Sequence, residues 1–213
     1  MTPFTTLRAV AAPLPIANIS TDDIFPGPGA TGLPAGMSFS DPAKMGPNAF
    51  AVMRWNADGS PRPDFILNRS PWDTAQIIVA RDNFGCGSSR EHAVWCMAAI
   101  GMRCVIAPSF GDIFYGNCFK NGMLPVRLPV EQVERLLSLT AAPETATLNV
   151  DLTAQTVIDA GGGVHRFEVD AYRRDLLLNG LDEIEASLRA GPLIEAHDAA
   201  YCARRPWLRA DTA

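Results

Sequence analysis

The sequence has no long hydrophobic run. Its longest uncharged apolar stretch is ten residues, Ala93 to Met102, whereas a membrane-spanning helix needs about 20. The N-terminal segment, residues 1–15, has one arginine and no continuous apolar core, so it does not resemble a secretory signal peptide. We therefore expect no membrane segment and no membrane partner.

Metal-binding and disulfide patterns are also missing. The five cysteines are an odd number, none of them spaced as CxxC, and only three histidines accompany them. They are Cys86, Cys96, Cys104, Cys118 and Cys202, with His92, His165 and His197. A disulfide framework or a zinc site built by this chain alone is not expected. Unpaired thiols in a reducing cytoplasm fit this usage best.

Charge of one sign is not in large excess. The net charge is -5, which argues against nucleic acid as the main partner. Hydrophobic residues make up 47% and charged residues 19% of the chain, which excludes wholesale disorder. A length of 213 residues corresponds to one ordinary domain, so we expect a single domain over residues 1–213.

Regular structure is excluded from residues 24–40. This stretch has four glycines, three prolines and no charge, and that density of breakers is compatible with neither a helix nor a strand. We expect a flexible loop that borders a functional site. Residues 56–72 are a second irregular stretch.

Strands and helices alternate from residue 76 onward. Short continuous apolar runs are typical of buried strands, and the stretches that follow them have helical character. Strands are expected at 76–80, 104–108 and 124–128, and helices at 90–102, 109–122 and 129–139. Strand and helix alternating with short links indicate an α/β layer with parallel strands.

The pattern changes after residue 141. Shorter alternating segments predict a second group of strands at 147–152, 155–160 and 165–170. Residues 171–206 are expected to form C-terminal helices, broken at Asn179-Gly180 and Gly191-Pro192. The sum is an α/β core, a second group of strands and a helical C-terminal tail.

Reactive residue types concentrate in the turn at 82–92, which follows a predicted strand and opens a helix. Ligands of α/β sheets bind at such strand ends. Gly85 and Gly87 permit close approach to the backbone, and Arg90 offers a cationic fork for a carboxylate or phosphate. Because Ser88 stands beside it, we expect an anion site with a hydroxyl at hand.

Purely local explanations of this turn remain open. Ser88 to Glu91 has the S-x-x-E pattern of a capping box, which by itself would account for a well-made helix start. A nucleophile pair of Cys86 and His92 would require the fold to bring the two side chains together. The residue pattern alone does not decide among these readings.

Three other polar clusters were considered. Residues 20–23, Ser-Thr-Asp-Asp, either start the following loop as a turn or bring Asp22 across to orient Arg90. Lys120 reads as a basic residue near a helix end. Arg173 and Arg174 are expected on a solvated helix face.

Three segments together carry a family resemblance. They are ARDNFGCGSSREHA at 80–93, VIAPSFGDIFYGNCFKNGMLPV at 105–126 and RRDLLLNGLDEI at 173–184. In this combination the chain resembles the small subunit of 3-isopropylmalate dehydratase, which corresponds to the swivelling fourth domain of aconitases. The resemblance covers nearly the whole chain, apart from residues 25–58.

The resemblance implies a swivelling β/β/α domain that is active only with a large subunit. That partner would carry a [4Fe–4S] cluster, and this chain would bind no cofactor or metal. The implied reaction interconverts 2-isopropylmalate and 3-isopropylmalate, small hydroxy-dicarboxylates of leucine biosynthesis, by dehydration and rehydration.

Site residues are implied by the same resemblance. Ser88 matches the serine that acts as the general base, and Arg90 matches the arginine that grips a substrate carboxylate. Further substrate contacts are implied at Ser89, Gly87, Asp22 and Thr21. Because Ser88 is also a candidate helix cap, we expect its hydroxyl to exchange the cap for the substrate.

One segment departs from the family pattern. The family usually continues after STDDI with Pro, Lys and an aromatic residue, but here residues 25–30 read FPGPGA. The segment is associated with the choice of substrate side chain. Another alkylmalate, such as methylmalate or dimethylmalate, therefore stays open as the substrate. So does a non-catalytic domain that only binds a partner.

Overall fold

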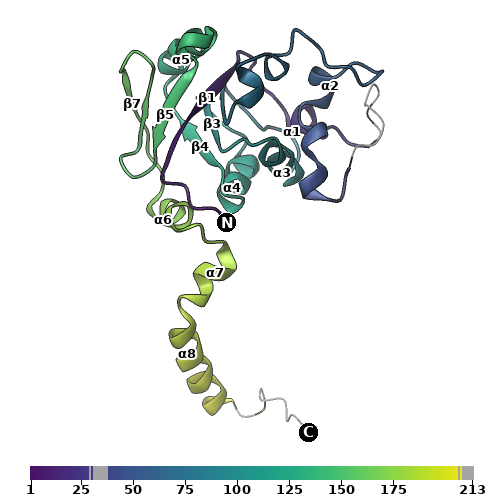
Figure 1. Cartoon of the computed structure of the whole chain (residues 1–213). Helices are drawn as coiled ribbons and strands as arrows, with labels where there is room; N and C mark the ends of the chain where they lie inside the picture. The colour runs from purple at the N-terminus through teal and green to yellow at the C-terminus, as the bar shows by residue number, and fades with distance from the viewer. Residues whose placement is uncertain (29, 31–37, 206, 208–213) are drawn as a thin grey trace.

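The fold is a mixed seven-stranded sheet in the order β4-β3-β2-β1-β5-β6-β7 (Figure 1). The computed structural model describes residues 1–28, 30, 38–205 and 207. The strands are β1 Thr6–Leu14, β2 Ile77–Ala80, β3 Cys104–Ala107, β4 Leu124–Arg127, β5 Thr147–Asp151, β6 Thr156–Ile158 and β7 Val164–Arg166. The predicted α/β class is confirmed.

The half of the sheet from β1 to β4 is parallel. Every residue of β2 and β3 is buried, as expected for strands covered on both faces. The helices that follow β2, β3 and β4 are α3 His92–Ala99, α4 Asp112–Lys120 and α5 Val130–Thr140. Each lies within or close to the range predicted from the sequence.

The central strand β1 was assigned no element by the sequence analysis. Its last four residues pair in parallel with β2, and its first five pair antiparallel with β5. The predicted second group of strands is therefore not a separate extension, because it continues the same sheet through β1. β7 is also shorter than the predicted strand at 165–170: residues 167–170 leave the sheet, and Asp170 caps the next helix.

Apolar side chains fill both faces of the sheet. Ile78 and Ala80 of β2 belong to the core on one face, with residues of α3, while Ile77 and Val79 belong to the core on the other face, with residues of α5. This alternation is the two-residue period of a strand. Burial on both faces fixes the register of β2 and the turn that follows it.

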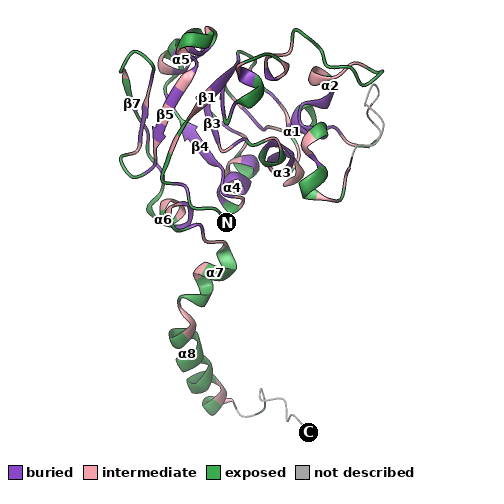
Figure 2. Cartoon of the chain, viewed as in Figure 1, coloured by how far each residue is buried: buried purple, intermediate pink, exposed green. Residues whose placement is uncertain are grey.

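The C-terminal helices are α6 Ala171–Asn179, α7 Glu183–Leu188 and α8 Gly191–Arg204. The predicted break after Asn179 is confirmed, since Gly180 ends α6 with a φ of 65°. The second break comes slightly earlier than predicted, because Gly191 and Pro192 begin α8. α8 extends away from the sheet and buries no residue (Figures 1 and 2).

The described residues between β1 and β2 form mostly irregular structure. They contain two one-turn helices, α1 Thr21–Ile24 and α2 Ala51–Arg54, and several single 3-10 turns, and residues 56–72 contain no strand or α-helix. Ile24, the first residue of the predicted loop, thus ends α1. Residues 29 and 31–37 of that loop lie outside the described residues. In the part of the chain that is described, no helix is long and apolar enough to cross a bilayer.

Candidate active site

The candidate site forms where β1 and β2 end. The segment after β1 runs beside the segment after β2, as carboxyl ends of neighbouring parallel strands do. Three backbone hydrogen bonds join them: Asn18 N–H to the Asp82 carbonyl at 2.9 Å, Gly85 N–H to the Ile19 carbonyl at 2.7 Å and Thr21 N–H to the Cys86 carbonyl at 2.7 Å. The two polar clusters of the sequence therefore meet.

Two glycines let other parts of the chain approach the turn after β2 closely: α4 at Gly85 and the segment after β1 at Gly87. Gly85 has a φ of +74°, and a Cβ there would lie 2.2 Å from the Phe114 ring. Gly87 has a φ of +103°, and a Cβ would lie 3.4 Å from Thr21 Oγ1. A larger residue at Gly85 would be strained by its backbone and would clash with α4. The sequence analysis explained these glycines by the close approach of a ligand, whereas in the structure other parts of the chain lie close to them.

Ser88 is held from two sides. Its backbone N–H donates to Thr21 Oγ1 at 2.8 Å. Its hydroxyl oxygen accepts from Arg90 Nε at 3.1 Å and from the Arg90 backbone N–H at 3.4 Å. Thr21 is only 2% exposed, and its buried hydroxyl contacts the Ser88 backbone. The serine oxygen lies against a guanidinium.

Arg90 also forms an ion pair with Asp22 through its Nη2. Asp22 belongs to α1, the helical turn after β1, which begins with a capping box between Ser20 and Asp23. Both partners of the Arg90–Asp22 pair remain exposed to solvent. Both readings of residues 20–23 are therefore met: the segment is a locally capped turn, and its Asp22 also reaches Arg90.

The capping box predicted for Ser88 and Glu91 is absent. α3 begins at His92, with Glu91 as its N-cap and no side-chain capping bond. Because Ser88 lies three residues upstream of that cap, its hydroxyl bonds to Arg90 instead. The expected exchange of a helix cap for the substrate is therefore wrong.

Cys86 and His92 do not form a nucleophile pair. The Cys86 thiol lies 3.5 Å from the Asn18 carbonyl. The His92 ring packs on Phe25, with centroids 5.1 Å apart, and on Trp95, at 4.8 Å. His92 is therefore part of an aromatic cluster behind the site.

The sequence analysis missed the contribution of α4. A cavity of about 300 Å³ lies between residues 85–88 and residues 111–114, the start of α4. A Cβ at Gly111 would lie 2.6 Å from the Gly85 carbonyl oxygen, so the two turns are in close contact. The sequence did contain a signal for this contribution: Gly111 follows closely after the strand predicted at 104–108. Ser89 is exposed, and its carbonyl accepts from Asn117 Nδ2 of α4 at 3.4 Å.

Three of the five cysteines, Cys96, Cys104 and Cys118, are buried. All five are free thiols. Burial raises the pKa of Cys96 to about 12 and also raises the pKa values of Cys104 and Cys118, so these three thiols stay protonated and unreactive. Among the described residues, no group of three or more His, Cys, Asp or Glu is placed to hold a metal ion.

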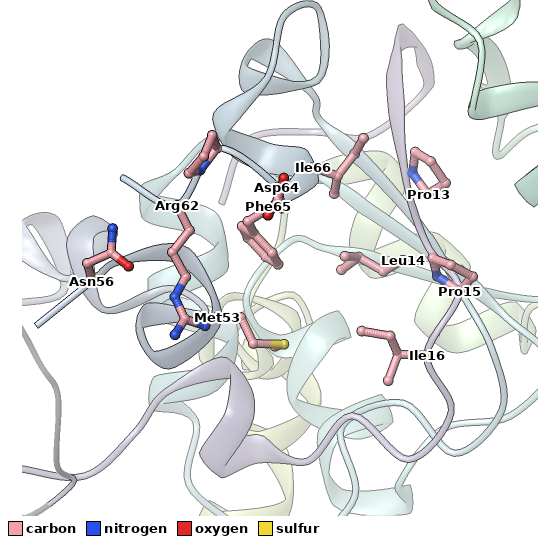
Figure 3. A pocket seen from close by; sticks show the side chains of 11 residues that line it. Pro13, Leu14, Pro15, Ile16, Met53, Asn56, Arg62, Asp64, Phe65 and Ile66 are labelled. Carbon is pink, nitrogen blue, oxygen red and sulfur yellow. The ribbon is translucent and has the colours of Figure 1, made fainter. Parts of the chain in front are cut away.

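A larger cavity, of about 590 Å³, lies beside the end of β1. Leu14, Ile16, Met53 and Phe65 point into it (Figure 3). Its walls are mainly apolar, and none of the predicted site residues lines it. The predicted residues gather instead around Ser88 and Arg90.

Comparisons with known proteins agree with this fold. The family model described as the Aconitase C-terminal domain matches residues 1–131, and that described as LeuD_N matches residues 134–171. The 3-isopropylmalate dehydratase small subunit of Dinoroseobacter shibae is 47% identical over 98% of this chain and 100% of its own length. That of Rhizobium meliloti is 47% identical over 97% of this chain and 100% of its own length.

A solved structure has the same fold. The crystal structure of 3-isopropylmalate dehydratase from Methanocaldococcus jannaschii superposes with a TM-score of 0.63 at 24% identity, over 91% of this chain and 99% of that chain. The full-length relatives and the domain match lead to one conclusion: this chain belongs to the family of 3-isopropylmalate dehydratase small subunits, within the aconitase superfamily.

Proposed function

We propose that the chain is the small subunit of a hydro-lyase that interconverts 2-isopropylmalate and 3-isopropylmalate in leucine biosynthesis. The names of the full-length relatives support this substrate. The observation that carries the proposal is the contact of the Ser88 hydroxyl with Arg90, which Asp22 orients from the other cluster. A serine and a guanidinium held together at a strand end suit a proton transfer next to a carboxylate.

Ser88 is the general base in this proposal. A serine hydroxyl is a weak acid, so its alkoxide needs nearby positive charge, and Arg90 Nε supplies that charge at 3.1 Å. The alkoxide takes the proton α to a substrate carboxylate. Ser89 and Gly87 lie beside it as substrate contacts, and the cavity in front of α4 gives the substrate room.

Arg90 binds the substrate carboxylate. A guanidinium presents donors on two edges, and in this structure Asp22 occupies one of them while Ser88 Oγ accepts from Nε. The substrate carboxylate then pairs with Arg90 in place of Asp22 or beside it. Asp22 keeps the guanidinium oriented between turnovers, and buried Thr21 acts through the Ser88 backbone.

A large subunit completes the site and carries the [4Fe–4S] cluster. The described part of this chain offers no group of metal ligands, so the cluster does not fit here. The name "small subunit" of the relatives supports a larger partner. We further infer one domain over the whole chain, because one sheet joins its two halves, and a cytoplasmic location, because all five cysteines are free.

A different alkylmalate is the second candidate substrate. Gly27, in the segment that departs from the family pattern, lies beside Arg90: a Cβ there would be 3.7 Å from Arg90 Nη1. This segment therefore borders the place where the substrate would bind. A changed loop at this point alters the space for the alkyl group without touching Ser88.

The test is an assay of this chain mixed with its cluster-loaded large subunit. Isopropylmalate, methylmalate and dimethylmalate are offered in parallel, and the unsaturated intermediate is followed by absorbance. Ser88→Ala should lower turnover by about 10²–10⁴-fold, as loss of a general base does. Ser187→Ala, at an exposed serine of α7, is the matched control and should leave turnover unchanged.

Each outcome has one meaning. Turnover of isopropylmalate supports the leucine-pathway substrate, and turnover of another malate alone moves the pathway but keeps the chemistry. An unchanged rate in Ser88→Ala would refute the role of Ser88. No turnover of any malate, with the two subunits shown to bind, would favour a non-catalytic partner-binding domain.

A further inference from the structure

Two arginines from different elements converge on one tyrosine ring. Arg127, the last residue of β4, has its guanidinium carbon 3.9 Å from the centroid of the Tyr115 ring in α4. Arg173 of α6 lies 5.3 Å from the same ring and 5.1 Å from that of Phe119. Arg173 is thus half-buried on aromatic rings, and its predicted place on a solvated face is wrong. Cation–π attraction explains each contact but brings like charges together.

Arg127 also shares a cavity with another arginine. Arg127 and Arg166, at the end of β7, line a cavity of about 420 Å³. Its other lining residues are Ala154, Gln155, Phe167 and Glu168. Within the described chain, none of the three arginines has a carboxylate oxygen within 4.0 Å of its guanidinium nitrogens. Glu168 is the single carboxylate that lines this cavity.

The local charge is opposite to that of the whole molecule. The chain carries a net charge of -5, yet two guanidinium groups and one carboxylate line this cavity, and a third guanidinium lies on the ring that Arg127 contacts. Arginine side chains keep their positive charge in proteins, so guanidinium groups held close together repel each other. An anion that binds between the guanidinium groups would remove the repulsion and satisfy their donors.

The cavity also offers a neutral donor. Gln155 uses its side-chain oxygen to accept from the Val169 N–H at 2.7 Å. Its amide N–H groups are then left to donate to a ligand, since oxygen and nitrogen of one amide have opposite roles. Phe167 is 4% exposed and gives this wall a fixed position.

From this convergence we propose that the cavity between Arg127 and Arg166 is a second anion site, which binds a small oxyanion with two negative charges. A phosphate monoester and a short dicarboxylate share this chemistry. The site is separate from Ser88 and Arg90, which do not line it. Arg127 and Arg166 bind the anion directly, and Arg173 holds the Tyr115 ring on which Arg127 rests.

The experiment is calorimetric titration of the full chain with inorganic phosphate and, separately, with malonate, at constant ionic strength. Both should bind saturably, and the tighter of the two identifies the source of the ligand. Arg127→Gln and Arg166→Gln should each raise the Kd about tenfold or more, the loss expected for one charge-assisted contact. Arg69→Gln is the matched control, because Arg69 also stacks on one ring, that of Trp72 at 5.5 Å.

Thermal unfolding gives a second readout, the rise in Tm caused by the anion, which can be measured even if a variant is less stable than the parent chain. A dianion that binds only the native chain raises its Tm, and this rise should disappear in Arg127→Gln while the Tm without anion stays equal or increases. If all three variants weaken anion binding equally, or if chloride competes at equal ionic strength, the effect is general charge screening and not a specific site. Loss of anion binding on addition of the large subunit would make the cavity a protein interface and overturn the proposal.

Discussion

Thr21 acts on Ser88 through a buried hydroxyl. The resemblance placed it among the substrate contacts, but its side chain is 2% exposed and accepts a hydrogen bond from the Ser88 N–H at 2.8 Å. This hydrogen bond joins residues 67 positions apart in the chain and holds the Ser88 backbone against α1. The geometry gives Thr21 a positioning role.

Thr21→Val tests this role at the level of a single residue. Valine keeps the shape of threonine but leaves the Ser88 N–H without a partner, which costs about 1–3 kcal/mol. We expect lower stability in urea and a reduced kcat with little change in KM, since the serine is displaced while Arg90 is intact. Thr21→Ser should restore both values; a Thr21→Val protein with normal kcat would contradict the positioning role.

The turn after β2 and the start of α4 form one packed unit. Gly85 approaches Phe114, and Gly111 approaches the Gly85 carbonyl, so neither turn tolerates a Cβ without movement. The sequence analysis explained Gly85 by the close approach of a ligand. The structure shows instead that Gly85 packs against α4. The cavity beside Ser88 exists because these two turns are held at close range.

Gly85→Ala should therefore destabilise the fold strongly. A left-handed backbone costs alanine about 1–2 kcal/mol, and the clash at 2.2 Å with Phe114 adds to it. Gly101→Ala is the control, because Gly101 has a φ of +89° with nothing within 4 Å of its Cβ position. Urea unfolding should show a larger loss for Gly85→Ala; equal losses would mean that the contact with Phe114 contributes nothing.

The β6–β7 hairpin has its own electrostatic element around Asp159. Burial alone would raise the pKa of this carboxyl, but bonds from the Gly163 N–H, His165 and the Gly161 N–H, with the charge of Arg135, hold it below its ordinary value. A lowered pKa in the native state means that the carboxylate stabilises the fold at neutral pH.

Acid should remove this stabilisation. The contribution of Asp159 is present above its unfolded pKa of about 3.9 and is lost as pH falls through the lower native value. Asp159→Asn should be less stable at neutral pH and show a weaker loss of stability on acidification, measured by urea unfolding across pH. Asp73→Asn, at an exposed carboxylate, is the control; parallel pH profiles for Asp159→Asn and the parent chain would disprove the assignment.

The whole molecule is organised around β1, with α8 outside it. β1 joins the parallel and antiparallel halves of the sheet, so both family-model matches, residues 1–131 and 134–171, lie on one sheet. The last helix, α8, leaves this body and carries exposed apolar side chains such as Leu193 and Tyr201. Burial of apolar area stabilises a fold, so α8 adds little to this one.

A chain ended before Gly191 should keep the stability of the full chain. Because α8 buries no residue, we expect the free energy of unfolding to change by no more than about 0.5 kcal/mol, as for surface changes. Urea unfolding of the two chains at equal concentration checks this. A clear loss of stability in the shortened chain would show that α8 packs on the body in solution.

Much of the fold follows from local patterns in the sequence. Continuous apolar runs marked β2, β3 and β4, because strands buried on both faces need them. The break at Gly180 followed from the need for a left-handed residue at a helix end. β1 was missed because its pattern is mixed: its first five residues are partly exposed and its last four are buried, with Pro13 among them.

The sequence by itself determined which residue types the site has and that they follow β2. The tertiary structure decided which of them touch. Residues 20–23 and 88–91 both have capping patterns, yet only the first forms the box, because α3 begins at His92 and leaves Ser88 three residues upstream of the N-cap. Asp22 reaches Arg90, and Thr21 reaches Ser88, because β1 and β2 are neighbours in the sheet. Contacts between residues far apart in the chain depend on that pairing, which no local pattern contains.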